Sequence, residues 1–149
     1  FAPDEDAERA VPVTILYRLD GSPNVSSESV FADVSSDSWY ADSIAWAADN
    51  DIAKGIGGDL FAPDKGVSRQ EMATVAMQAC GVNYRNASST MPVCADSAEV
   101  SNNYGTNVAR ALYFGFMTLD EAGRFRPTAP VTMKETVRII NRVADFAGM

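Results

Sequence analysis

The feature that most constrains the fold of this chain is an internal repeat. Residues 1–21 align without a gap on residues 61–81, at an offset of 60. The residues common to both copies are, in the first copy, Phe1, Ala2, Pro3, Asp4, Arg9, Thr14 and Gly21. Part of the same block returns at a further offset of 64, as Phe125, Pro127, Val131 and Glu135. Self-similarity of this kind is typical of folds that use one supersecondary unit several times.

The repeats divide the 149 residues into three parts. Residues 1–21 are the second half of a first repeat, residues 31–81 are a complete second repeat, and residues 94–146 are a third repeat that has diverged further. The linkers 22–30 and 82–93 are rich in Ser, Asn and Pro, which favour loops.

Each complete repeat has the pattern of two helices joined by a glycine-containing loop. In the second repeat the apolar spacing predicts a first helix from Ser38 to Ala53, a loop over residues 54–67 and a second helix that begins near Arg69. Ser68 and Glu71 have the spacing of a capping box, in which the hydroxyl accepts from the amide three residues on and the carboxylate accepts from the serine amide.

The other two copies keep this pattern less completely. Thr132 and Glu135 supply a second capping box in the third repeat. In the first repeat Glu8 and Val11 replace the box residues, and Pro12 lies where a helix would continue. We therefore expect the helix of the first repeat to have a shifted or distorted start.

A single helical hairpin of this size cannot bury its own apolar face. Several must pack together, so we expect the second helices of the repeats to meet in a shared bundle. The predicted fold class is all-α, built from tandem helix-loop-helix repeats.

Composition excludes several kinds of function. A net charge of −8 argues against a nucleic-acid ligand and against a polybasic membrane-binding patch. No apolar run approaches the ~20 residues of a membrane span, so we expect no membrane insertion. The chain has no histidine, which removes Ser-His and Cys-His catalysis and histidine metal sites. A catalytic carboxylate pair does not stand out, so we expect no enzymatic activity, no cofactor and no metal.

Cys80 and Cys94 allow two interpretations. They could form one disulfide across the second linker, which would suit an oxidising compartment. They could instead be two buried thiols, because unpaired cysteine often packs as a small apolar residue. Spacing alone does not choose between them.

Two acidic residues and one tryptophan have expected structural roles. Asp33 and Asp96 precede the first helices of their repeats, and short acidic side chains there are expected to cap or brace the loop before the helix. Trp46 lies off the main apolar stripe, so we expect it to be half exposed or packed on a neighbouring repeat.

The start of the second helix offers a place for an anion. Arg69 falls in the first helical turn, where free amides and the positive end of the helix dipole gather. A guanidinium beside such amides can bind a carboxylate or a phosphate.

The second repeat resembles an S-layer homology repeat. The matching string is FADVSSDSWYADSIAWAADNDIAKGIGGDLFAPDKGVSRQEMATVAMQACG. The positions that carry the resemblance are Phe31, Asp33, Val34, Trp39, Tyr40, Ile44, Ala47, Phe61, Pro63, Val67, Ser68, Arg69 and Glu71. With the partial repeat before it and the divergent repeat after it, the resemblance covers nearly the whole chain.

This resemblance implies a fold and a function. Such modules usually come in threes and form a pseudo-threefold, three-pronged helical assembly with the second helices at its centre. They hold secreted bacterial proteins non-covalently on the cell surface or in the S-layer. The implied ligand is a secondary cell-wall polysaccharide, often with pyruvate ketals, whose carboxylate binds the arginine at the helix start in a groove between repeats. Other surface-layer protein chains are further candidate partners.

The three copies keep the binding residues that the resemblance implies to different degrees. The third repeat has Met133 at the arginine position, so we expect at most two competent sites, one with Arg9 and one with Arg69. A groove between consecutive repeats would join Arg9 to Trp39 and Tyr40, and Arg69 to Asn103 and Tyr104. The candidate ligand-binding residues are Arg9, Arg69, Trp39, Tyr40, Gly57, Gly58 and Glu71. The two glycines would let backbone amides approach the ligand closely.

A second function fits the same residues. The chain could be a structural or protein-interaction module of a bacterial surface assembly that has kept the fold and lost glycan binding. Met133 and Asn103, which replace the expected arginine and tryptophan, favour that alternative for the third repeat.

Overall fold

The computed structural model describes residues 2–26, 28–81 and 94–149. Phe1 and the linker 82–93, which enter the predictions above, lie outside this range. The helices of the described residues are α1 (Ala10–Leu19), α2 (Ala41–Asp49), α3 (Arg69–Ala79), the short 3-10 helix η2 (Ser97–Glu99), α4 (Gly105–Tyr113) and α5 (Met133–Ala147). The predicted all-α class is confirmed, since these residues form isolated β-bridges but no sheet.

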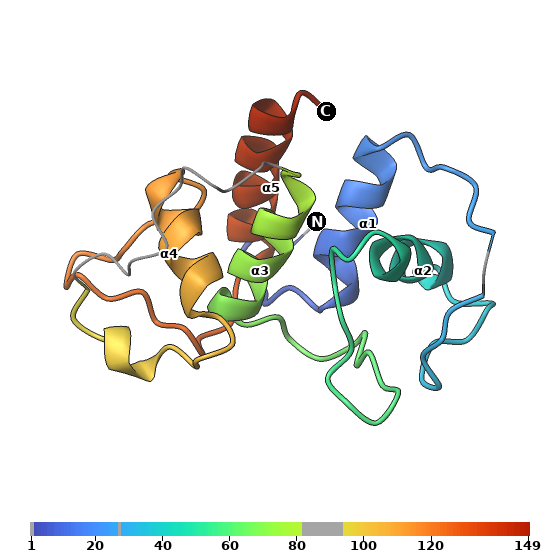
Figure 1. The fold of residues 1–149 in the computed structure, drawn as a ribbon, viewed down its shortest axis with the longest axis horizontal. Coiled ribbons are helices and arrows are strands. Elements are labelled where there is room, and N and C mark those ends of the chain that lie inside the picture. Colours follow the sequence, from blue (N-terminus) through green and yellow to red (C-terminus); the bar gives the residue numbers. More distant parts are fainter. Residues whose placement is uncertain (1, 27, 82–93) are drawn as a thin grey trace.

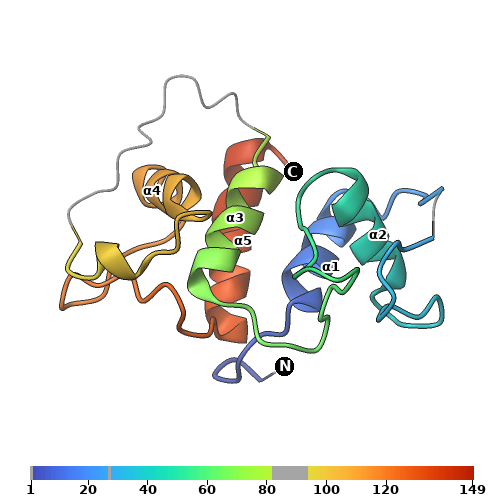
Figure 2. The same ribbon diagram turned by 60° about the horizontal axis from the view of Figure 1, so that its bottom comes forward.

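The second helices of the three repeats form the centre of the molecule. Each of α1, α3 and α5 contacts the other two (Figure 1). The first helices lie outside this bundle, with α2 packed on α1 and α4 packed on α3 (Figures 1 and 2). The expected shared bundle is therefore present, and each first helix covers the second helix of the repeat before it.

The core lies along these helix contacts. Side chains that are almost completely buried come from every α-helix and include Leu16, Ile44, Met72, Val108 and Ile140. Trp46 joins α2 to the neighbouring repeat, because its Nε1 donates to Asp20 Oδ2 (3.2 Å) and its ring lies 5.7 Å from that of Tyr17. Packing on a neighbouring repeat was one of the two outcomes expected for this tryptophan.

A closed ring of three backbone hydrogen bonds joins the repeats ahead of the second helices. The amide of Ala7 donates to the carbonyl of Val131 (2.8 Å), that of Val67 to Ala7 (2.9 Å) and that of Val131 to Val67 (3.1 Å). These residues occupy the same position in the three repeats, and all are buried. A second set of three bonds lies two residues later and runs the opposite way around the three repeats, since the amides of Arg9, Arg69 and Met133 donate to the carbonyls of Lys65, Ala129 and Glu5. The three copies are thus related by a pseudo-threefold axis.

The helix starts follow the capping sequences. At α3 the predicted box is formed, because Ser68 Oγ accepts from the Glu71 amide (3.3 Å) and the Glu71 carboxylate accepts from the Ser68 amide (3.4 Å). At α5 the structure has the first half of the box, in which Thr132 Oγ1 accepts from the Glu135 amide (3.2 Å). The Glu135 carboxylate turns instead to Arg69.

The first repeat has the shifted helix start that its sequence predicts. α1 begins at Ala10, one repeat position later than α3, and its N-cap Arg9 makes no side-chain capping bond. Pro12 lies in the first turn of α1, where its missing N–H removes no intrahelical hydrogen bond.

The first helix of the second repeat is shorter than the predicted Ser38–Ala53. It ends at Asp49, because Asn50 Nδ2 donates to the Trp46 carbonyl (2.8 Å) and Asp51 takes a left-handed φ of 56°. Ile52 is nevertheless buried, since its amide donates to the Ala47 carbonyl (2.8 Å) and folds the loop back against the helix.

Asp33 and Asp96 brace a different segment from the one expected. The two carboxylate oxygens of Asp33 accept from the amides of Phe61 (2.9 Å) and Ala62 (2.7 Å), and Asp96 does the same to the amides at 125–126 (2.8 Å each). Ala62 has a left-handed φ of 56°, which is unfavourable for a residue with a Cβ and needs such support. The prediction that these carboxylates brace the loop before the first helix is therefore wrong, because they hold the segment that leads into the second helix.

These carboxylates should make the fold sensitive to acid. Burial alone would raise the pKa of Asp33 and Asp96, but the amide hydrogen bonds outweigh it and hold both pKa values below the ordinary 3.8. A carboxyl group whose pKa is lowered by folding stabilises the native state above its ordinary pKa and loses that contribution as the pH falls through the folded value. We expect Asp33→Asn/Asp96→Asn to be less stable than the parent at neutral pH, and to lose less stability between about pH 5 and about pH 3.

Urea unfolding midpoints measured across that pH range check this expectation. The matched control is Asp37→Asn/Asp145→Asn, which removes two exposed carboxylates. If the Asp33/Asp96 variant and the parent lose stability in parallel on acidification, these two groups are not the source of the acid sensitivity.

Candidate ligand-binding site

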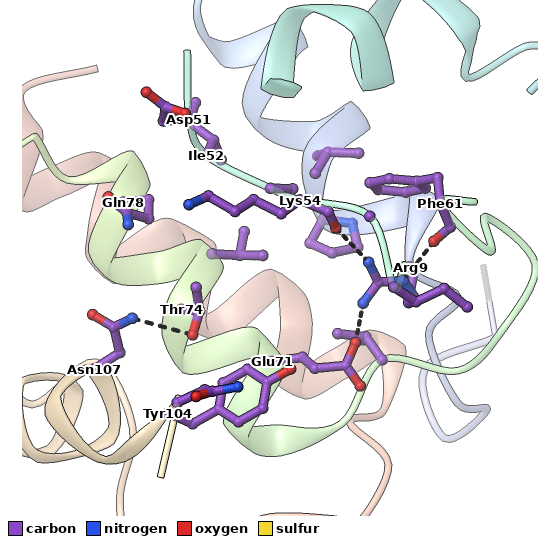
Figure 3. A pocket seen from close by; sticks show the side chains of 18 of the residues that line it. Arg9, Asp51, Ile52, Lys54, Phe61, Glu71, Thr74, Gln78, Tyr104 and Asn107 are labelled. Carbon is purple, nitrogen blue, oxygen red and sulfur yellow. Dashed lines mark hydrogen bonds and ion pairs between the residues drawn. The ribbon is translucent and has the colours of Figure 1, made fainter. Parts of the chain in front are cut away.

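A pocket of about 720 Å³ lies between segments of all three repeats (Figure 3). Its walls are the start of α1, parts of the loop 51–67, one side of α3, and the start of α4 at residues 103–107. The ring of backbone bonds brings the starts of α1 and α3 together, and the packing of α4 on α3 adds the third wall. The volume falls in the range of small-ligand sites.

Arg9 is fixed at one side of this pocket. Its Nε donates to the Phe61 carbonyl (2.9 Å), its Nη2 donates to the Lys54 carbonyl (2.9 Å), and its Nη1 binds the Glu71 carboxylate. The guanidinium also lies over the Phe61 ring, 4.9 Å from its centre. The Arg9 side chain is only 10% exposed. Arg9 therefore holds the first and second repeats together and shapes the pocket wall.

Arg69 makes the same set of contacts one repeat further on. Its Nε donates to the Phe125 carbonyl (2.6 Å), its Nη2 to the Thr118 carbonyl (2.9 Å), and its Nη1 binds Glu135. The guanidinium lies 4.9 Å from the centre of the Phe125 ring. Arg69 is 3% exposed and does not line the pocket at Arg9. A direct contact between Arg69 and a ligand stays a prediction.

The third copy has an apolar pair at these positions. Met133 takes the arginine position and Val11 takes the glutamate position, and both pack half-buried against the core. Both members of the ion pair are replaced together. This is the expected result for a pair with a structural role, because one buried charge without its partner is strongly destabilising.

Lys54 is the cation that reaches across the pocket. Its side chain extends toward Gln78 (Figure 3), while its own carbonyl is held by Arg9. The other charged lining residues are Arg9, Glu71, Lys65 and Asp51. Because Arg9 and Glu71 neutralise each other, two lysines and one aspartate remain. The lining of this pocket thus has a positive balance, although the chain as a whole carries a net charge of −8.

The aromatic side chain beside Glu71 in this pocket is Tyr104 (Figure 3). The expected pairing of Arg9 with Trp39 and Tyr40 does not hold here, because α4 packs on α3 and brings the start of the third repeat toward Arg9. Trp39 and Tyr40 lie outside the pocket, with their ring centres 5.0 Å apart and Trp39 61% exposed.

Gly57 and Gly58 lie outside this pocket, and their predicted close approach to a ligand stays a prediction. They take positive φ values of 106° and 61° in a turn. The lining glycine is Gly55, where an added Cβ would lie 2.5 Å from the Leu60 carbonyl oxygen and 2.7 Å from the Phe31 ring. This close packing fixes the backbone directly after Lys54.

Among the described residues, the possible disulfide between Cys80 and Cys94 is not formed. Both side chains are buried thiols. Cys80 Sγ donates to the Met77 carbonyl (3.2 Å), and burial raises the pKa of the Cys94 thiol. The structure therefore has the second of the two arrangements that the sequence left open.

Sequence reasoning did not single out Lys54 and Asn107, and it expected Tyr104 beside Arg69 rather than in the Arg9 pocket. Lys54 precedes the glycine of the tight loop, and Tyr104 and Asn107 lie at the start of α4. Asn107 Nδ2 donates to Thr74 Oγ1 (3.2 Å) and so ties α4 to α3. The pseudo-threefold register was the signal that could have found them, because it determines which first helix approaches which arginine.

Comparison with known proteins connects this chain to bacterial surface proteins. The family model described as the S-layer homology domain matches residues 30–73 and 95–133, together more than half of the chain. The first segment lies in the second repeat and the other in the third. The boundaries predicted for the three repeats stay predictions.

Three relatives contain a similar segment. The chain is 28% identical over 142 residues to the Surface-layer 125 kDa protein of Lysinibacillus sphaericus, covering 93% of this chain and 12% of that protein. It is 25% identical over 150 residues to an Amylopullulanase of Thermoanaerobacterium thermosulfurigenes, covering 99% of this chain and 8% of that protein. It is 23% identical over 154 residues to Cell surface glycoprotein 1 of Acetivibrio thermocellus, covering 97% of this chain and 7% of that protein. The chain thus spans about a tenth of the length of these relatives.

In the part of the chain that the structure describes, each helix is too short or too polar to cross a bilayer.

Proposed function

We propose, from the premise that this chain belongs to the S-layer homology domain family, that it is a non-covalent, non-catalytic anchoring module at a bacterial cell surface. The relatives support this proposal. A surface-layer protein, a cell-surface glycoprotein and an amylopullulanase all contain a segment similar to this chain. A segment found in proteins with such different names suits a task that they have in common, and attachment of a secreted protein is such a task.

The proposed ligand is an acidic cell-wall polysaccharide. The observation that carries this part is the positive balance of the Arg9 pocket in a chain of net charge −8. A sugar with a carboxylate, such as a pyruvate ketal, would place its acidic group near the lysines and its ring against Tyr104. The side-chain amides of Asn103, Asn107 and Gln78 would hydrogen-bond the hydroxyl groups.

A second candidate function rests on the third copy. Met133 and Val11 replace the ion pair, so the equivalent position has no arginine to shape a charged wall. That position suits a structural or protein-interaction role, with other surface-layer chains as candidate partners. On this view the fold serves assembly, and the Arg9 pocket binds no glycan.

Binding to isolated cell walls tests the proposed function. We expect the purified protein to sediment with walls, and to stay in solution when the wall polysaccharide has been removed chemically. Tyr104→Ala should weaken wall binding about fivefold, because it removes an aromatic contact with the sugar. The matched control is Tyr113→Ala, which removes an exposed tyrosine at the other end of α4.

Equal binding to intact and stripped walls would contradict the glycan proposal and favour the second candidate. Equal affinities of the two tyrosine variants would show that the ligand does not lie in the Arg9 pocket.

A further inference from the structure

We propose that Lys54 is the residue that recognises the acidic group of the ligand, and that Arg9 is a positioning residue that acts through Lys54. This inference rests on the proposed function, since it concerns the same pocket. It departs from the expectation drawn from the sequence, in which the arginine at the helix start itself binds the carboxylate.

The contacts of Arg9 leave it poorly placed for this task. Each of its three guanidinium nitrogens already has an acceptor, and its charge is matched by the Glu71 carboxylate. One face of the guanidinium is covered by the Phe61 ring. A ligand carboxylate would have to compete with Glu71 for a side chain that is only 10% exposed. A ligand that took Arg9 would leave the Glu71 carboxylate without its partner, which is unfavourable in a partly buried site.

Lys54 has the opposite properties. It is an exposed residue, and in the described part of the chain no ion pair ties its side chain to an acid. Its stem crosses the pocket (Figure 3), so the ammonium group stands in the space that a ligand would enter. An ammonium has three donors and no acceptor, and it binds an anion as a compact point charge.

The backbone of Lys54 is held more firmly than its side chain. Arg9 Nη2 donates to its carbonyl (2.9 Å), and Gly55 is packed against Leu60 and Phe31 so closely that a Cβ would not fit. The base of the lysine is therefore fixed, and the ion pair of Arg9 with Glu71 fixes the wall from which it extends. This is how Arg9 would influence ligand binding without touching the ligand.

The geometry also gives the orientation of the ligand. The Lys54 side chain points toward Gln78, away from Arg9, and Tyr104 lies on the side of the pocket next to Glu71 (Figure 3). The carboxylate would lie between the Lys54 ammonium and the Gln78 side chain, which can donate a second hydrogen bond. The sugar ring would then extend toward Tyr104. The ligand class is a hexose that carries one carboxylate on a short substituent, as a pyruvate ketal does.

The test compares an acidic sugar with its uncharged form. The probes are the methyl glycoside of a pyruvate-ketal hexose and the methyl ester of the same compound, titrated by NMR into the parent protein and its variants. We expect the parent to prefer the acid. Lys54→Gln should lower the affinity for the acid about tenfold or more and leave the affinity for the ester unchanged, because only the charged hydrogen bond is lost. Lys54→Arg should keep most of the preference.

Lys134→Gln is the matched control, since it removes the same charge from an exposed lysine that does not line the pocket. It should change the preference less than about twofold. The role of Arg9 is tested by Arg9→Lys, which keeps a cation but loses the fork that holds the Lys54 carbonyl. This variant should reduce the preference for the acid in the parent background and not reduce it further in the Lys54→Gln background, which loss of overall stability would not explain.

Three outcomes would overturn the proposal. The first is an undiminished preference for the acid in Lys54→Gln. The second is an equal loss of affinity for acid and ester, which would make Lys54 a wall of the pocket rather than the acid-recognising group. The third is the absence of any binding by the parent, which would remove the proposed function along with it. A parent that binds both probes, with a preference that survives in Lys54→Gln, would contradict only this inference.

Discussion

Glu135→Val is expected to lower the free energy of unfolding by about 3–5 kcal/mol, because it leaves a buried guanidinium without its carboxylate. Arg69 is 3% exposed and binds Glu135 between α3 and α5. Arg69→Met should cost less, about 2–3 kcal/mol, because the carboxylate that it leaves behind is 31% exposed and can be hydrated. Equilibrium unfolding in urea measures both effects.

The third copy supplies the design for the decisive variant. Met133 and Val11 show which apolar pair the fold accepts at these positions, so Arg69→Met/Glu135→Val transfers that pair to the second site. We expect this double variant to be more stable than Glu135→Val by about 2 kcal/mol, because no charge is left buried. Glu121→Val, at an exposed loop position, is the control for loss of one carboxylate. A double variant as unstable as Glu135→Val alone would show that the ion pair is not the origin of the effect.

Phe61→Ala is expected to be as damaging, with a loss of about 3–5 kcal/mol in the free energy of unfolding. The Phe61 side chain is 1% exposed, lies under the Arg9 guanidinium and packs on the Phe31 ring at 5.3 Å. The substitution leaves a cavity at the junction of the first two repeats and removes one wall of the pocket. Thermal and urea unfolding measure the stability, and the acidic-sugar titration measures the effect on the pocket.

Leu60→Ala is the neighbouring control, because Leu60 is 40% exposed. It should cost less than about 1 kcal/mol, since most of the removed surface already contacts water. Similar losses of unfolding free energy in the two variants would mean that the Phe61 ring does not stabilise the junction between the first two repeats.

The sequence was sufficient to predict where the helices of the fold lie, but it was insufficient to predict their lengths. The repeats, the capping box at Ser68 and the shifted start of α1 all follow from local patterns, because a cap or a proline acts within one helical turn. The early end of α2 does not follow from the apolar spacing. It depends on the left-handed backbone conformation of Asp51. Ile52 continues the apolar spacing of the helix in sequence, but in the structure it lies in the loop after α2 and is buried there.

The candidate site was predicted only in part, for a physical reason. Arg9 was identified from its place in the repeat, and it does line the pocket. Its partners include the backbone carbonyls of Lys54 and Phe61. Every residue type has such a carbonyl, so the sequence does not indicate which ones Arg9 binds. Tyr104 reaches the pocket because α4 packs on α3, and that choice of neighbour belongs to the arrangement of the repeats rather than to any motif.

The backbone ring of Ala7, Val67 and Val131 has a consequence for folding. Its bonds join residues that are 60, 64 and 124 positions apart in the chain. In an open array of repeats each unit touches only its neighbours, and folding can start anywhere and spread. Here the first copy bonds directly to the last, so the loop between them must close before the ring can form, at an entropic cost. A chain with so many distant contacts should fold slowly for an all-helical protein, and its copies should unfold together as one cooperative unit.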